Sequence, residues 1–361
     1  MAHLITDLNQ LTPERLTEIL RTNGVLERGE VTRIIHELHP RTTDVGINGY
    51  ILAYLFVTYS VDASPDAPKR LFFKLKKVAA RGTGKEVYFY KIITVNVPEL
   101  PVLRCYDAVI AESGRCHLLL EDVSETHFTP RPPTQWQPEF DRASAEQIID
   151  GYAKLHAYYW DNEEQWDELT DAIGGQFYVS EAYIRADSHA SDEQLAEFFD
   201  YRKNELNAQQ KRWFERVVQR LPDLLSERLH RENVTIGHQD ANTWNILRPR
   251  NRVDTVRIID WESYNLWFGA DDITAPFVRY QPPELRKAWE IELLQRYHNR
   301  LLEYGVTGYN WDTLWYDYRL ATMYWLFYRI GVPDQTRVPI ANWLLANTLR
   351  AFEELHCEEL L

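Results

Sequence analysis

The stretch GHQDANTWNIL (237–247), followed by RIIDWE (257–262), decides how this chain of 361 residues is interpreted. In outline the two stretches give His-x-Asp-x-x-x-x-Asn, then a turn, then a hydrophobic strand that ends in an aspartate. The spacing lets one loop present both Asp240 and Asn245 to one site, and a short hairpin can return Asp260 beside Asn245. We therefore expect two brief strands around a turn within 245–260.

These oxygen-bearing side chains are typical of phosphoryl transfer, a reaction that needs positioning and charge neutralisation more than covalent help. Asp240 can accept or orient the proton of an attacking hydroxyl. Asn245 and Asp260 can supply the hard oxygen ligands that Mg²⁺ prefers. The alternative is that all three are polar caps of loops and strand ends. Each residue alone suits that alternative, but their joint spacing between apolar strands favours the functional interpretation.

The chain upstream of the motif is rich in strands. Runs of β-branched or aromatic residues bounded by Pro, Gly and Asp occur at 31–38, 50–60, 70–77, 105–112 and 116–122. A helical stretch at 86–97 interrupts them, and Thr12 and Pro13 predict the start of an N-terminal helix at about 12–23. The first third therefore predicts a small antiparallel sheet with one inserted helix.

The chain beyond a Pro-rich loop at 127–138 is mainly helical. The clearest helices are 144–160 and an amphipathic stretch from Ser191 to about Leu229. The aromatic-rich stretch 311–329 is expected to be core more than pocket. The fold class is α+β, and strands give way to helices near residue 121.

Both motifs resemble those of the aminoglycoside phosphotransferase and choline kinase superfamily, relatives of the protein kinases. The pattern is nearest to the ecdysteroid-kinase-like branch of small-molecule kinases, and the similarity extends from about residue 40 to 330. It implies a protein-kinase-like two-lobed fold. Residues 1–120 would form the nucleotide-binding lobe, a small antiparallel sheet with one helix. Residues 121–361 would form a hinge and a larger helical lobe with the catalytic loop and the acceptor site.

The resemblance also implies site residues in the first lobe. Lys74 in LFFKL matches a strand lysine that orients the α- and β-phosphates of ATP, and Glu86 in EVYFYKII matches the helix glutamate that pairs with it. LLLEDV (118–123) is similar to the hinge between the lobes, where backbone groups of Glu121 and Val123 would bind adenine.

Other positions in this lobe are open to more than one interpretation. Lys74, like Lys76, could instead be a solvent-facing lysine on an edge strand. The loop that covers the phosphates should lie near 41–50, where backbone amides with Thr43 or Asn48 could hold them, although this loop is no Gly-x-Gly-x-x-Gly.

The second lobe has two further landmarks of the superfamily, KLHAYYW (154–160) and GADDIT (269–274). His156 is expected to be a hydrogen-bonded core or interlobe histidine, and Asp272 to brace the catalytic loop. Glu262, beside Asp260, could approach metal or substrate or have a structural role.

Composition narrows the classes of function. The net charge of −14, from 40 basic and 54 acidic residues, argues against a nucleic-acid partner, which requires a basic surface. No apolar run is long enough to span a membrane, the start has no signal segment, and the three cysteines lack metal-ligand spacing. A cytoplasmic location is the simplest expectation, with no membrane partner.

We therefore expect a phosphotransferase that uses ATP and Mg²⁺ to phosphorylate a hydroxyl of a small molecule, an aminoglycoside-, choline- or steroid-like alcohol. The alternative is a catalytically silent kinase-like protein that binds a nucleotide or small molecule. Loss of the lysine, the base or a metal ligand would favour that alternative, and the sequence retains all of them. The acidic, aromatic composition favours a rigid apolar or amine-bearing alcohol over an anionic sugar phosphate.

Overall fold

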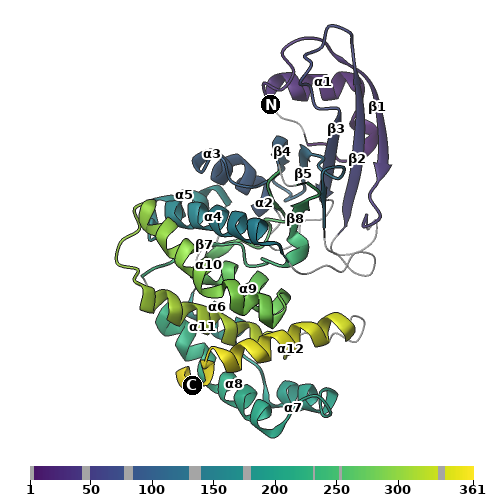
Figure 1. Ribbon diagram of the computed structural model, residues 1–361. Coiled ribbons are helices and arrows are strands. Elements are labelled where there is room, and N and C mark those ends of the chain that lie inside the picture. Colours follow the sequence, from purple (N-terminus) through teal and green to yellow (C-terminus); the bar gives the residue numbers. More distant parts are fainter. Residues whose placement is uncertain are drawn as a thin grey trace. The chain divides into compact units, whose positions relative to one another are not determined.

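The computed structural model describes residues 4–42, 49–76, 84–129, 140–173, 180–230, 232–251, 254–331 and 338–361 (Figure 1). The internal contacts divide the chain into two units. The first is Met1–Phe128 with Leu247–Ser263, and the second is Thr129–Ile246 with Tyr264–Leu361.

A five-stranded antiparallel sheet in the order β1-β2-β3-β5-β4 forms the first unit. Its strands are β1 (Val31–Leu38), β2 (Tyr50–Tyr59), β3 (Arg70–Lys76), β4 (Cys105–Ile110) and β5 (Cys116–Glu121), close to the predicted runs. Since β3 is the central strand, the edge-strand alternative for Lys74 is wrong.

One face of this sheet is covered by α1 (Pro13–Thr22), as Figure 1 shows. Thr12 caps the helix by accepting a hydrogen bond from the Arg15 backbone N–H at 3.2 Å, as predicted. Leu16 and Leu20 of the helix share a buried core with Ala53 and other alternate residues of β2. The period-two burial of β2 is what a strand with one covered face requires.

The helical stretch predicted at 86–97 consists of α2 (Lys85–Tyr88), a π-helical turn (Phe89–Ile93) and α3 (Thr94–Asn96). The π-helical turn was not predicted. Phe89, in that turn, stacks on the ring of Trp261 with a centroid separation of 4.0 Å.

The predicted hairpin after the motif is present as β8 (Ile246–Pro249) and β9 (Arg257–Ile258). With β6 (His127–Phe128) they form a three-stranded sheet in the order β6-β8-β9. The backbone N–H of Ile258 also donates to the carbonyl of Pro101 at 2.7 Å. These contacts attach the segment that carries Asp260 to the first unit, although it lies late in the sequence.

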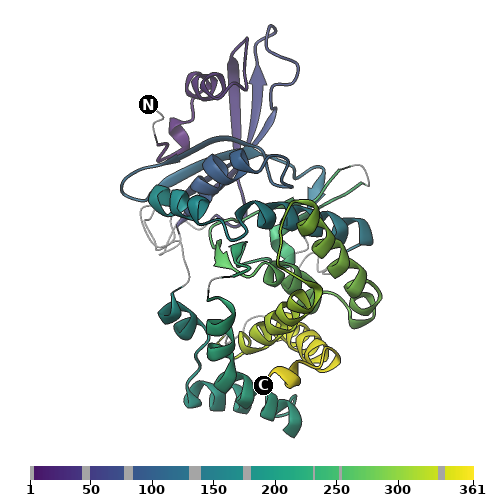
Figure 2. The same cartoon turned by 90° about the vertical axis from the view of Figure 1, so that its left-hand side faces the viewer.

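The second unit is mainly helical. Its elements are α4 (Arg142–Tyr159), α5 (Glu163–Ile173), α6 (Glu181–Asp187), α7 (Asp192–Tyr201), α8 (Ala208–Arg228), β7 (Thr235–Gly237), β10 (Asn265–Trp267), α9 (Ala270–Tyr280), α10 (Pro283–Glu303), α11 (Trp311–Phe327) and α12 (Val338–Glu354). All residues of α9 are buried, and α4, α10, α11 and α12 pack around it. Figure 2 shows α11 and α12, in yellow-green and yellow, next to each other.

The single amphipathic stretch expected from Ser191 to Leu229 is in fact two helices, α7 and α8. The break is explained by Asn207, which begins α8 with a reciprocal capping box to Gln210. The expectation that the aromatic residues of 311–329 are core is confirmed for Tyr318, Tyr324, Trp325 and Phe327, which are buried. The other aromatic residues of this stretch are partly buried or, at Tyr328, exposed.

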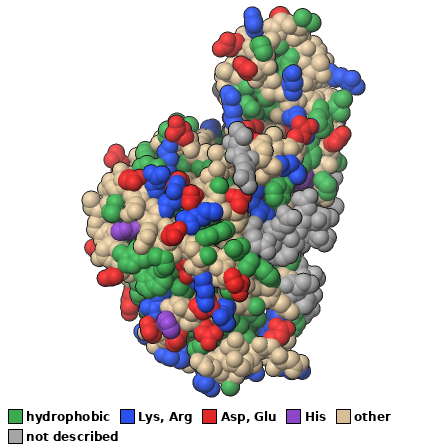
Figure 3. Space-filling model, viewed as in Figure 1, with side chains coloured by type: hydrophobic (Ala, Val, Ile, Leu, Met, Phe, Trp, Pro, Cys, Tyr) green, Lys and Arg blue, Asp and Glu red, His purple; other side chains and the backbone are tan. Residues whose placement is uncertain are grey.

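Acidic and basic side chains are interspersed on the face seen in Figure 3. None of the helices in the described ranges combines the length and the apolar composition that crossing a membrane requires.

Candidate functional site

The predicted nucleotide-side residues of the first unit lie together. The Nζ atom of Lys74, in the centre of β3, is 2.6 Å from Glu86 Oε2 and 3.1 Å from Asp260 Oδ1. Glu86 comes from α2, and its carboxyl group is buried. Asp260 follows β9 and its side chain is 37% exposed. One lysine therefore bridges a buried carboxylate and a more exposed one.

Burial alone would lower the pKa of Lys74, but the carboxylates of Glu86, Asp260 and Glu262 outweigh it and hold this pKa well above its ordinary value. Burial raises the pKa of Glu86, and the charge of Lys74 offsets only part of that effect. The charged form of Lys74 is thus favoured by its acidic neighbours, two of which it contacts directly.

A second lysine lies beside the first, and its partners were not predicted from the sequence. Lys76 Nζ is 3.2 Å from Glu262 Oε2, and the hydroxyl of Tyr50 donates to the same oxygen at 2.6 Å. The Lys76 side chain is only 9% exposed, so a solvent-facing lysine is the wrong interpretation. The period-two spacing of Lys74 and Lys76 was the available signal, because it places both on one face of β3. We call Tyr50, Lys74, Lys76, Glu86, Asp260 and Glu262 the lysine cluster.

The residues predicted for adenine binding lie where β5 ends. Glu121 is the last residue of β5 and accepts from Arg257 Nε at 3.3 Å. The carbonyl of Val123 accepts from the backbone N–H groups of Thr126 and His127, which closes a turn after the strand. In the expected phosphate loop, Thr43 and Asn48 lie outside the described residues.

In the second unit, the loop 238–245 holds Asp240 through neutral amides. Asn245 Nδ2 donates to Asp240 Oδ2 at 2.8 Å and to the Asp240 carbonyl at 2.9 Å. Asn242 Nδ2 donates to the other carboxylate oxygen, Oδ1. Because the two ends of an amide point apart, the Asn245 carbonyl oxygen is turned away from Asp240.

Backbone strain accompanies both parts of the predicted site. Gln239 has φ of 63° and Asp260 has φ of 69°, in the left-handed region that residues with a Cβ rarely adopt. Such conformations persist where surrounding contacts impose them, and they are frequent at functional sites.

The loop 238–245 is braced from α9. Asp272 Oδ2 accepts from the His238 backbone N–H at 2.6 Å and lies 3.2 Å from His156 Nε2. Tyr297 OH lies 2.7 Å from His156 Nδ1, so the histidine is fixed at both ring nitrogens. The expectations for Asp272 and for a hydrogen-bonded core His156 are confirmed. Gly269 permits this packing, because a Cβ there would lie 2.4 Å from Tyr297 OH.

A third set of contacts reaches Asn242. Arg279 Nη1 and Tyr280 OH, at the end of α9, donate to Asn242 Oδ1 at 3.0 and 2.6 Å. The Arg279 guanidinium is buried and lies 4.0 Å over the ring of Trp325. Arg279 was not predicted from the sequence, although a charged residue in the apolar run ITAPFVRY (273–280) was an available signal.

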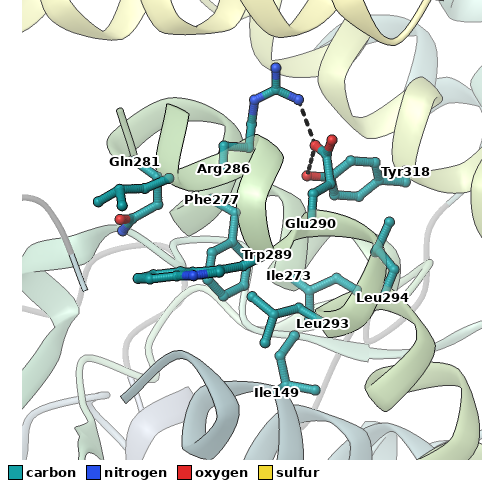
Figure 4. Close-up of a pocket in the computed structure, with 11 residues that line it drawn as sticks. Ile149, Ile273, Phe277, Gln281, Arg286, Trp289, Glu290, Leu293, Leu294 and Tyr318 are labelled. Atoms are coloured by element: carbon teal, nitrogen blue, oxygen red, sulfur yellow. Dashed lines mark hydrogen bonds and ion pairs between the residues drawn. The ribbon is translucent and has the colours of Figure 1, made fainter. Parts of the chain in front are cut away.

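One enclosed pocket in the second unit lies among α4, α9, α10 and α11 (Figure 4). Its walls include Ile149, Phe277 and Leu293, and Glu290 bonds Arg286 and Tyr318 at its edge. The cavity is only about 10 Å³, at most enough for one water molecule. It is therefore no acceptor site.

Comparisons with known proteins identify a family and a shared fold. Residues 93–306 match the sequence profile of the ecdysteroid kinase-like family. No curated protein gave a significant match in sequence.

Among solved structures, a candidate aminoglycoside phosphotransferase from Ralstonia eutropha JMP134 is 14% identical, with a TM-score of 0.51 over 94% of this chain and 99% of that one. An ethanolamine kinase from Plasmodium vivax is 14% identical, with a TM-score of 0.49 over 89% and 83%. A type I macrolide 2'-phosphotransferase is 16% identical, with a TM-score of 0.47 over 97% and 98%. The first of these shows a shared fold, so the predicted α+β fold of the kinase-like phosphotransferases is confirmed.

Proposed function

The chain belongs to the ecdysteroid kinase-like family, and on that premise we propose that it transfers the γ-phosphate of ATP to a hydroxyl of a small molecule in the presence of Mg²⁺. The observation that carries the proposal is Lys74, held 2.6 Å from Glu86 and 3.1 Å from Asp260. A buried lysine kept charged by acidic partners is suited to bind phosphate oxygens. The first unit would bind the nucleotide, and the second the acceptor.

On the nucleotide side, Lys74 would contact the α- and β-phosphates while Glu86 keeps its side chain extended. Backbone groups of Glu121 and Val123, at the end of β5, would bind adenine. These assignments rest on the motif positions, and the ion pair supports the first of them.

Asp260 and Asn245 would hold Mg²⁺, which would neutralise charge on the phosphates. The donor set suits this ion, because a carboxylate and an amide carbonyl are hard oxygen ligands. Among the described residues no group of three or more His, Cys, Asp and Glu side chains forms a metal-binding cluster. Two protein ligands supplemented by phosphates are the usual arrangement for Mg²⁺ in such enzymes.

Asp240 would accept a hydrogen bond from the acceptor hydroxyl and orient its oxygen toward the γ-phosphorus. The new P–O bond forms to that oxygen as the bond to the departing ADP breaks. The hydroxyl proton passes to Asp240 or to the phosphorylated product. The carboxylate is suited to this role because amides fix both of its oxygens.

The test is a screen of alcohols for ADP release that depends on both the alcohol and Mg²⁺. The panel contains matched cationic, neutral apolar and phosphorylated alcohols, and kcat/KM is compared among them. We expect amine-bearing or apolar alcohols to be the best acceptors. If phosphorylated alcohols are best, that preference is wrong while phosphotransfer stands. If calorimetry finds no ATP binding with or without Mg²⁺, the protein is not such an enzyme.

A further inference from the structure

The contacts of Asp240 extend beyond the loop that carries it. Its two carboxylate oxygens accept from two different amides, Asn242 on Oδ1 and Asn245 on Oδ2. Asn245 is set by its second bond, to the Asp240 carbonyl. Asn242 needs another support, since a side-chain amide can turn end for end and present its oxygen instead.

Arg279 and Tyr280 supply that support. Both contact the Oδ1 atom of Asn242, at 3.0 and 2.6 Å. A guanidinium can only donate hydrogen bonds, so the amide end that faces Arg279 must be its oxygen. The NH₂ end of Asn242 is consequently directed to Asp240. If the amide turned round, its NH₂ would face a cation and its oxygen would face a carboxylate.

The helix α9 is a rigid support for these contacts. Asp272 and Arg279 are seven residues apart, so about two helical turns separate them on one face. Asp272 holds the start of the loop at His238, and Arg279 holds it at Asn242. Asn347 Nδ2, from α12, donates to the Arg279 carbonyl at 3.0 Å and fixes the end of the helix.

We propose that Arg279 and Tyr280 are positioning residues for the carboxylate of Asp240 and that they act through Asn242. The inference rests on the proposed function, in which Asp240 orients the acceptor hydroxyl. The chain of contacts fixes the rotation of the carboxylate. A positioning role of this kind affects the chemical step and not the affinity for ATP.

The test compares Asn242→Ala and Tyr280→Phe with Tyr318→Phe as matched control. Like Tyr280, Tyr318 is a fully buried tyrosine of the second unit. Its hydroxyl donates to Glu290 Oε1 at 2.8 Å, away from the loop 238–245. ADP release from ATP and Mg²⁺ is measured with water and with the best alcohol of the screen. We expect kcat to fall by about 10²-fold in Asn242→Ala and by about 5–10-fold in Tyr280→Phe. The KM for ATP should stay within twofold, and Tyr318→Phe should keep its kcat.

Two further variants separate positioning from folding. Arg279→Lys, which keeps a cationic donor, should retain several-fold more kcat than Arg279→Met. In the Asp240→Asn background, Asn242→Ala should reduce kcat no further, because both changes act on one group.

The outcomes distinguish this inference from the proposed function. If the wild type is active, Asp240→Asn loses about 10²-fold or more of kcat and Asn242→Ala keeps more than half of it, only the positioning role is wrong. If Asn242→Ala reduces kcat by the same factor in the wild-type and in the Asp240→Asn background, the positioning role is also wrong. If the wild type releases no ADP with any acceptor, or Asp240→Asn is fully active, the proposed role of Asp240 fails and this inference falls with it.

Discussion

The lysine cluster of the first unit and the loop 238–245 of the second unit hold their acidic groups by different means. Lys74 and Lys76 pair with Glu86, Asp260 and Glu262 through charge. Asp240, in contrast, receives its hydrogen bonds from the amides of two asparagines, and Asp272 braces the loop backbone.

The difference indicates which acidic groups of the site can exchange their present partners for a bound ligand. An ion pair to the partly exposed Asp260 can exchange for a bound metal or phosphate, since water and ions compensate the charge. The amides around Asp240 have directional bonds and little exposure, because Asn242 and Asn245 are buried. If the proposed function is correct, the ion pairs of the first unit rearrange when ATP and Mg²⁺ bind, while the loop of the second unit presents a fixed carboxylate.

The most severe test of this comparison is Asp240→Asn. The change preserves shape but removes the charge that orients the acceptor hydroxyl, so turnover should fall by about 10²–10⁴-fold with the fold intact. Steady-state ADP release measures it, and Asp223→Asn, at an exposed carboxylate of the same unit, is the control. Turnover near the wild-type value in Asp240→Asn would show that the loop does not act on the acceptor.

Lys74→Met tests the charged side of the comparison. It leaves Glu86 and Asp260 without the cation between them and should lower kcat/KM for ATP by about 10²–10³-fold. Lys76→Met is the matched variant, two residues along the same face of β3, and should cost less because Lys76 contacts Glu262 instead. Equal losses in both variants would mean that the two lysines share one role.

Removal of Mg²⁺ tests whether Asp260 changes partners. ATP with Mg²⁺ should stabilise the fold by about 2.7 kcal/mol at a hundredfold excess over Kd. ATP alone should stabilise it less, and Asp260→Ala should lose most of the Mg²⁺-dependent part. Thermal unfolding measures the shift in Tm, with Asp254→Ala on the same hairpin as control. A full Mg²⁺-dependent shift in Asp260→Ala would rule this residue out as a ligand.

The sequence predicted those features whose signals are local. Alternating apolar residues gave the strands, and the Asp240–Asn245 spacing identified a loop in which the two side chains do bond. The structure also joins Lys74 and Glu86, which only the family resemblance had paired. Their roles in the reaction stay predictions.

The missed features depend on contacts between distant segments. Tyr50 joins the lysine cluster because it is opposite Lys76 in the pairing of β2 with β3, a register that composition does not specify. Arg279 reaches Asn242 across 37 positions of sequence, so no spacing rule could have paired them.

The smallest expected effect concerns Asp271, the neighbour of the Asp272 side chain that braces the loop 238–245. Asp271 is buried in the first turn of α9. Burial, reinforced by the charge of Asp272, raises its pKa well above the ordinary value, and Arg279 offsets only part of this. The shift favours the neutral acid over the carboxylate at Asp271.

Because folding raises the pKa of Asp271, its contribution to the stability of the fold is fully present below the pKa of an aspartate in the unfolded chain, about 3.9. That contribution is lost as the pH rises through the pKa of Asp271 in the folded protein. Asparagine has nearly the shape and polarity of the neutral acid, so Asp271→Asn should raise Tm at pH 8 and leave it unchanged near pH 4. The rise in Tm should be about 2–4 °C for each kcal/mol gained in the free energy of unfolding. Asp317→Asn is the contrasting variant. The carboxylate of Asp317 is buried against Arg228, with a distance of 2.6 Å from Arg228 Nη2 to Asp317 Oδ2. Loss of this negative charge leaves the Arg228 cation without its buried ion-pair partner. It should lower Tm at pH 8. A lower Tm for Asp271→Asn at pH 8 would mean that Asp271 is ionised in the folded protein.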